Sequence, residues 1–219
     1  MTDTETTLRQ AVVAACRKLE PLGLTQGTSG NVSVRCGDSM LISPSGIPYE
    51  DLTPELIADM PLDRNDGTWS GPCKPSTEWP FHLDILQSRP DVNAVVHGHP
   101  TYCTALSIAR KPIPRCHYMI AAFGGDDVRC AGYARFGSKE LSALIQEAMK
   151  DRTACLMANH GALAVAADLP KALWRAVELE AIAQQYYLSL SIGGPVLLSD
   201  QDIAEAHDAF AGYGLQDQK

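Results

Sequence analysis

The sequence predicts one domain of the α/β class over residues 1–219, with a sheet that need not be parallel. Two observations lead to this prediction. Apolar strand patterns alternate with helical patterns along most of the chain, and a turn signal at Gly37-Asp38 joins two neighbouring strands as a hairpin. The composition agrees, because 45% of the residues are apolar and 20% are charged, as in globular proteins with a full core.

The first helix and the hairpin are predicted from the spacing of apolar residues. Residues 5–19 repeat apolar side chains at helical spacing, and Pro21 and Gly23 end that pattern. Strands are expected over residues 31–35 and 40–43, on either side of the hairpin turn.

Three helices and one buried strand are expected in the next part of the chain. Thr53 can act as the N-cap of a short helix, with Pro54 in its first position. Ser76 and Thr77 can cap a second helix. The expected elements are the helices 53–57, 76–89 and 101–109 and the strand 92–97.

The remaining chain is expected to begin with an irregular segment, residues 110–137, which is followed by two strands and three helices. That segment is rich in proline, glycine and cysteine. Ser138 is the expected cap of the helix that follows it. The expected elements are the helices 138–150, 169–189 and 200–213 and the strands 153–157 and 162–165.

Charge and cysteine usage exclude several classes of function. The formal net charge is −8, so the surface repels nucleic-acid phosphates and sequence-independent binding of nucleic acid is not expected. No apolar run is long enough to span a membrane, and the polar N-terminus does not resemble a signal peptide. The seven cysteines form no Cys-x-x-Cys pair. We therefore expect reduced thiols and a cytoplasmic protein.

The sharpest chemical signal is the His-x-His pair of His97 and His99 at the end of an apolar strand. Side chains two residues apart on a strand share one face, so the two imidazoles can bind one metal ion. His160 also follows an apolar strand and precedes a glycine. Three imidazoles with an open fourth position are typical of a catalytic zinc site. The alternative is a hydrogen-bonded histidine pair in a loop.

Glu78 is the best candidate for a catalytic carboxylate, and its neighbours strengthen that interpretation. It is expected in the first turn of a helix, where an acidic side chain can simply complement the helix dipole. Ser76 and Thr77 add hydroxyls and free N–H groups at the same helix N-terminus, which is a natural anion site.

Two further loops carry neutral hydrogen-bond donors. Residues 27–31 and 43–46 are turns built from Gly, Thr, Ser, Asn and Pro, and neither is a Walker loop or a dinucleotide fingerprint. Each could be ordinary turn chemistry. Together with Ser76 and Thr77 they suggest a phosphate cradle made of neutral donors.

These motifs, in this order, resemble those of the class II aldolase/adducin family, and the resemblance covers nearly the whole chain. It rests on residues 27–33, 41–49, 75–82, 97–99, 117–125, 134–137, 160–161, 171–174 and 213–215. It implies a three-layer α/β/α fold with a largely antiparallel central sheet. It also implies a homotetramer with fourfold symmetry and active sites between subunits.

The resemblance also implies roles for individual residues. Zn²⁺, or another divalent ion such as Mn²⁺ or Co²⁺, would be held by His97, His99, His160 and Glu78, with Glu78 displaced to act as base. Tyr118 of a neighbouring subunit would be the proton donor. The substrate phosphate would be held by Asn31, Ser45, Gly46, Ser76 and Thr77, with Thr28 and Gly30 shaping their loop. Phe136 and Tyr213 would shape the aldehyde side.

The expected reaction is retro-aldol cleavage of a ketose-1-phosphate to dihydroxyacetone phosphate and a small aldehyde. Cleavage leaves an enediolate, whose charge a zinc ion would stabilise as a Lewis acid. Glu78 would move the proton beside the carbonyl, and Tyr118 would exchange a proton with the hydroxyl at the breaking bond.

L-Fuculose-1-phosphate is the first expected substrate, and several alternatives stay open. They are a 5-deoxy- or 5-methylthio-ribulose-1-phosphate, the reaction of a sugar-phosphate 4-epimerase, and a non-catalytic adducin-like interaction module. Asp126 and Asp127 form an acidic departure from the family pattern. We expect them near the aldehyde end, where they would affect substrate preference.

Overall fold

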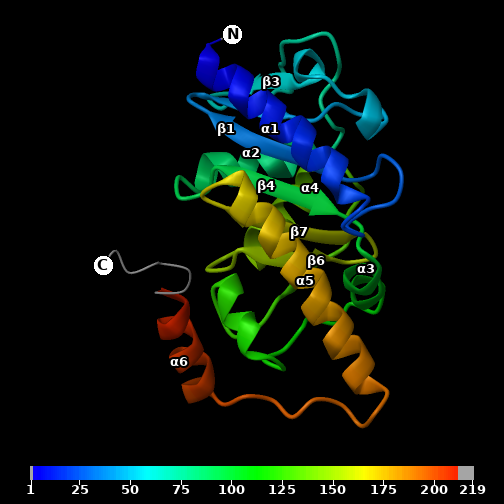
Figure 1. The fold of residues 1–219 in the computed structure, drawn as a ribbon, viewed down its shortest axis with the longest axis vertical. Coiled ribbons are helices and arrows are strands. Elements are labelled where there is room, and N and C mark those ends of the chain that lie inside the picture. The colour runs from blue at the N-terminus through cyan, green and yellow to red at the C-terminus, as the bar shows by residue number, and fades with distance from the viewer. Residues whose placement is uncertain (1, 212–219) are drawn as a thin grey trace.

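A computed structural model describes residues 2–211, and within them seven strands form one sheet (Figure 1). Neighbouring strands are antiparallel except for one parallel pair, β5 and β6. The strands in sheet order are β3 (Ala58–Pro61), β2 (Ser39–Ile42), β1 (Asn31–Cys36), β4 (Ala94–Gly98), β7 (Gly161–Ala166), β6 (Ala154–Met157) and β5 (Cys130–Ala131). The expected α/β fold with a largely antiparallel sheet is therefore confirmed.

Helices cover both faces of this sheet and give it three layers. One face carries α1 (Asp3–Leu19), α3 (Thr101–Ile108) and α5 (Leu169–Leu190); the other carries α2 (Trp79–Ser88) and α4 (Lys139–Ala148). The 3₁₀ segment η3 (Tyr118–Phe123) packs against α6 (Asp200–Ala211) at one end of the molecule, below the sheet in Figure 1. No helix in the described part of the chain is both long and apolar enough to cross a membrane.

Strand alternation divides the side chains between two apolar clusters and places the polar ones. On β4, Ala94 and Val96 join the cluster beneath α1, α3 and α5, whereas Val95 joins the cluster beneath α2 and α4. His97 continues the alternation on the α2 side, where its ring packs edge-on against Phe81. The antiparallel register sets Asn31 of β1 directly opposite His97. Candidate site residues from distant parts of the sequence thus meet between the sheet and α2.

Two glycines allow the strand ends to approach each other. A Cβ at Gly161 would lie 2.4 Å from the Gly98 carbonyl oxygen and 2.6 Å from Cδ2 of His99. A Cβ at Gly98 would lie 2.3 Å from the Leu24 carbonyl oxygen. Real Cβ contacts are longer than these, so Gly161 lets the two His-Gly strand ends pack together, and Gly98 lets the end of β4 pack against the backbone of Leu24.

The structure also corrects several local expectations. The helix expected from Ser76 begins at Trp79, so Glu78 occupies the N-cap position rather than the first turn. The helix expected at 53–57 is a 3₁₀ turn, η2 (Pro54–Leu56), and the Thr53 side chain makes no capping bond. The sequence analysis also missed β3, η3, β5 and the 3₁₀ turn η1 (Tyr49–Asp51), which are all short elements without a clear periodicity.

Candidate active site

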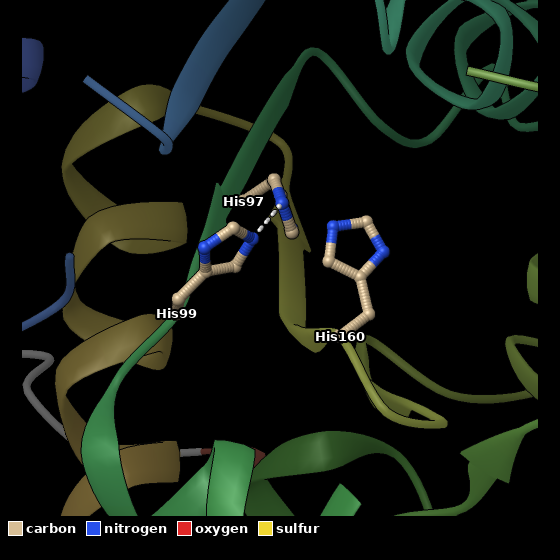
Figure 2. A group of neighbouring side chains, drawn as sticks. All are labelled: His97, His99 and His160. Atoms are coloured by element: carbon tan, nitrogen blue, oxygen red, sulfur yellow. Dashed lines mark hydrogen bonds between the residues drawn. The ribbon is translucent and has the colours of Figure 1, made fainter. Parts of the chain in front are cut away.

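Three histidines from two strand ends form one cluster (Figure 2). His97 is the next-to-last residue of β4, His99 follows that strand directly, and His160 lies in the turn between β6 and β7. Their ring centroids are 4.9 to 5.0 Å apart, and the Nε2 atoms of His97 and His99 are 3.1 Å apart. One nitrogen from each ring lies within 4.8 Å of the others. The expected neighbourhood of the two strand ends is thus present in the fold.

The orientation of His97 is fixed from behind by the sheet. Its Nδ1 lies 2.9 Å from the carbonyl oxygen of Ala162 on β7. A carbonyl only accepts, so Nδ1–H donates, and Nε2 is left for a proton or a metal ion. Such a hydrogen bond behind a histidine is the usual support of a metal ligand.

Glu78 touches two of the three histidines. Its Oε2 lies 3.1 Å from Nε2 of His97, and its Oε1 lies 3.2 Å from Nε2 of His160. Burial alone would raise the pKa of this carboxyl. Attraction to the His97 ring and hydrogen bonds from His97 and Asn31 outweigh burial and hold the pKa of Glu78 well below its usual range. Glu78 is therefore an ionised carboxylate although its side chain is buried.

The donor set fits a divalent cation. Burial, followed by repulsion from His97, lowers the pKa of His99 to about 3 and that of His160 to about 4, so both rings are neutral near pH 7 and can act as ligands. Oε1 of Glu78 is buried without a hydrogen-bond partner. The contacts of 3.1 to 3.2 Å between these donors are near the edge length of a tetrahedron around zinc, about 3.3 Å for metal–ligand bonds of about 2.0 Å.

A cavity of about 460 Å³ opens above this cluster and collects most of the predicted binding residues. Glu78, His99 and His160 line it, whereas His97 is fully buried beneath. The other predicted residues that line it are Thr28, Gly30, Asn31, Ser45, Gly46, Ser76, Thr77 and Phe136. No lysine or arginine is part of this lining among residues 2–211, so any anion there is held by neutral donors.

Backbone hydrogen bonds join two of the cavity loops and occupy donors that the sequence analysis expected to be free. The N–H of Ser76 donates to Ser43, and the N–H of Ser45 donates to Lys74. The Ser76 hydroxyl in turn accepts from the N–H of Glu78. The expectation of a free N–H at Ser76 is therefore wrong, because that group links the loop to the sheet.

Tyr118 is a predicted site residue that lies away from this cavity. Tyr118 lies on η3, where it is 56% exposed and stacks at 6.3 Å on Phe210 of α6. It does not line the cavity of its own chain. Tyr213 lies outside the described residues.

Asp126 and Asp127 have a structural partner within the described chain, and their expected place near the aldehyde end stays a prediction. Both carboxylates pair with Arg152, at 3.0 Å and 2.8 Å, and neither lines the cavity. The Arg152 side chain is only 8% exposed, so these acids neutralise a buried cation.

Sequence reasoning missed five residues of the cavity wall: Ser29, Pro44, Tyr133, Ala134 and Asn159. Asn159 offered a signal, because an asparagine before His160-Gly161 can adopt the left-handed backbone that it has here, with φ of 54°. Tyr133 lies in the segment that was expected to be irregular, and no periodicity indicates its direction.

Comparisons with known proteins agree with this geometry. The family model described as the class II aldolase and adducin N-terminal domain matches residues 10–187. The chain belongs to this family. An L-fuculose phosphate aldolase of Escherichia coli O6:H1 is 50% identical over 210 residues, which covers 95% of this chain and 96% of the relative. A 5-methylthioribulose-1-phosphate/5-deoxyribulose-1-phosphate aldolase of Rhodospirillum rubrum is 45% identical over 94% of this chain and 92% of the relative.

Solved structures of class II aldolases share the fold. One titled L-fuculose 1-phosphate aldolase superposes with a TM-score of 0.89 at 39% identity, over 94% of this chain and 96% of that chain. The class II family depends on a divalent metal, and the histidine cluster is where this chain offers ligands for one.

Proposed function

We propose that the protein cleaves a ketose-1-phosphate, L-fuculose-1-phosphate first, to dihydroxyacetone phosphate and a small aldehyde, with a zinc ion at His97, His99, His160 and Glu78. The observation that carries this proposal is the ionised Glu78, which contacts two histidines and lines a cavity of neutral donors. A metal ion held there supplies a Lewis acid for the oxygens that become negative as the carbon–carbon bond breaks.

Glu78 is the proposed base of the reaction. Its carboxylate lines the cavity, and its Oε1, 3.2 Å from Nε2 of His160, makes no hydrogen bond within the described chain. This oxygen would accept the proton once the carboxylate is displaced from the metal ion. The substrate carbon beside the carbonyl would lie on this side of the histidines. Proton transfer by a positioned carboxylate accelerates such steps by about 10²- to 10⁴-fold.

The neutral donors of the cavity are the proposed phosphate site. Thr28, Ser45 and Thr77 offer hydroxyls, Asn31 offers an amide, and Gly46 has a positive φ of 71° with open space beside it. The phosphate does not react, so its binding energy serves to position the carbons that do.

Tyr118 is proposed to donate the proton at the aldehyde end from a neighbouring copy of the chain, in a homotetramer with active sites between subunits. The supporting observation is that this tyrosine is exposed and does not line its own cavity. Tyr213 is proposed for the same side of the site.

A 5-methylthio- or 5-deoxy-ribulose-1-phosphate is the second candidate substrate. Tyr133 and Phe136 line the cavity while 59% and 57% exposed, so they form an apolar rim that suits an aldehyde with a methyl or methylthio end, such as these ketoses and L-fuculose-1-phosphate would all release. The Rhodospirillum rubrum relative is named for such substrates.

One assay tests the proposal. The purified protein, with its metal content measured, is given L-fuculose-1-phosphate, the two ribulose derivatives and L-ribulose-5-phosphate, and release of dihydroxyacetone phosphate is followed. We expect about one metal ion per chain, activity on at least one ketose-1-phosphate, and loss of activity with a chelator. Isomerisation without release would favour the 4-epimerase, and a metal-free, inert protein would favour the adducin-like module.

A further inference from the structure

A buried chain of hydrogen bonds connects the sheet to the oxygen Oε2 of Glu78. Ser33 Oγ on β1 lies 2.8 Å from Nδ1 of His82, and Nε2 of His82 lies 2.5 Å from Oδ1 of Asn31. Asn31 Nδ2 lies 3.0 Å from Oε2 of Glu78. All four residues are at most 5% exposed, and Ser33 and His82 are fully buried.

The direction of each bond in this chain follows from the carboxylate. Ionised Glu78 only accepts, so Asn31 must present its amide N–H and keep its oxygen for His82. His82 must then donate from Nε2 and accept at Nδ1, so the Ser33 hydroxyl donates to it. Every donor in the chain therefore points toward Glu78.

We propose that His82, as the Nε2–H tautomer, is a positioning residue that fixes the Asn31 amide and thereby holds Oε2 of Glu78. The inference rests on the proposed role of Glu78 as base. With Oε2 held by Asn31, the proton would go to Oε1, which makes no hydrogen bond within the described chain and lies 3.2 Å from Nε2 of His160. A flipped Asn31 would set its oxygen against the carboxylate and its NH₂ against the His82 N–H, which disfavours the flip.

Within residues 2–211 the His82 side chain hydrogen-bonds to Ser33 and Asn31 and makes no hydrogen bond to Glu78, His97, His99 or His160. Its effect on the reaction must therefore pass through Asn31. One amide hydrogen of Asn31 is donated to Glu78, and the other remains for the proposed phosphate. Asn31 therefore connects the proposed base with the proposed phosphate site.

The first test is spectroscopic and independent of activity. A long-range ¹H–¹⁵N correlation spectrum of the metal-free protein, with ¹⁵N-labelled histidine and His82→Gln used for assignment, reports the tautomer of each ring. We expect His82 as the neutral Nε2–H form. A neutral Nδ1–H form would reverse the chain and overturn the proposal.

The second test is kinetic, with L-fuculose-1-phosphate or whichever ketose-1-phosphate the panel identifies. His82→Phe keeps a ring but removes the donor, and we expect kcat to fall about tenfold, the scale of one hydrogen bond, with KM changed less and metal content unchanged. His82→Gln, which can still donate to Asn31, should recover most of kcat. Ile85→Val, a buried change in the same helix, is the control for packing and should keep kcat.

A double-mutant cycle decides whether His82 acts through Asn31. The variant Asn31→Ala/His82→Phe should be no slower than Asn31→Ala alone. The inference is overturned if the losses in kcat of the two single variants multiply in the double variant, or if His82→Phe has an unchanged kcat. Glu78→Gln distinguishes the failure of one proposal from the failure of the other. If Glu78→Gln retains full activity, Glu78 is not the base. If Glu78→Gln is inactive while His82→Phe is fully active, only the positioning role of His82 is contradicted. If His82→Phe does not fold, the tautomer of His82 and the kcat of His82→Gln still test the positioning role.

Discussion

Glu78 is a charged side chain in a place where most carboxylates would be neutral. It stays ionised because imidazole rings and an amide surround it, and the same surroundings hold it in contact with both His97 and His160. The sequence singled out Glu78 and the three histidines as candidates, because His-x-His and His-Gly at strand ends are specific patterns, and the structure brings the four side chains together. It could not identify His82, since a histidine within a helix carries no sign of its buried partners.

Removing only the basicity of Glu78 should separate catalysis from metal binding. We expect Glu78→Gln to keep the metal ion and lose at least about 10²-fold in kcat, because glutamine keeps the size and hydrogen bonding but takes no proton. Rate measurements paired with metal analysis check this. A variant that loses its metal would make Glu78 a plain ligand, and an unchanged rate would remove it from the mechanism.

The phosphate cradle can be tested with residues that do not support Glu78. Asn31 and Ser76 bond to Glu78, so we choose Thr28→Ala with Ser45→Ala. Each hydrogen bond contributes about 0.5–1.5 kcal/mol. The kcat/KM for the phosphorylated ketose should therefore fall by a factor that corresponds to about 1–3 kcal/mol of lost binding free energy. The non-phosphorylated ketose, compared in both proteins, should be nearly unaffected. Equal losses on both substrates would place the phosphate elsewhere.

At the scale of elements, α3 begins shortly after His97 and His99, and a side chain of α5 caps the first turn of α3. The carboxylate of Glu180 on α5 accepts from the N–H groups of Tyr102 and Cys103, at 2.8 and 2.9 Å. These are N–H groups that a helix leaves unpaired in its first turn, where a negative charge is also favourable. Glu180 thus anchors the segment that follows His99.

Loss of this anchor should destabilise the fold and loosen the histidine pair. We expect Glu180→Ala to lower the free energy of unfolding by about 1–2 kcal/mol, the scale of a lost helix cap, and to weaken metal binding. Urea unfolding and metal competition measure the two effects. Glu178→Ala, two residues earlier on the same helix, is the matched control. Equal stability of Glu180→Ala and the control would contradict the anchoring role.

The long elements could be predicted from the sequence because each has a repeated signal. The helix from Ser138 and the paired strands near His160 were predicted within a few residues, and the Ser138 hydroxyl accepts from the N–H of Leu141 as expected. Register and layer order were not predictable, because which strand lies beside which depends on packing between distant segments. The placement of Asn31 opposite His97 is such a case.

For the whole molecule, buried neutral histidines make stability depend on pH. Burial lowers the pKa of His82 to about 3, whereas in the unfolded chain it is about 6.5. Between these values the unfolded chain binds a proton that the folded chain does not. The free energy of unfolding should therefore fall as pH decreases below about 6.5 and stay level above it.

Urea unfolding of the metal-free protein at pH 7.5 and pH 5.5 checks this dependence. Each such histidine should contribute a loss of about 1.4 kcal/mol over that interval, and carboxylates remain ionised across it. His82→Gln should show a loss smaller by about that amount. An identical pH dependence in both proteins would mean that His82 is not neutral in the fold.

The sheet order sets different mobilities for the parts of the site. His97, the Ala162 carbonyl behind it and Asn31 opposite it sit on β4, β7 and β1, the three central strands, whose amides should exchange slowly with solvent. Tyr133 and Phe136 belong to an irregular segment near the sheet's edge and are mostly exposed. We therefore expect the amides of this rim to exchange with solvent faster than those of the strands beneath the histidines, so that the rim would open without disassembly of the ligand cluster.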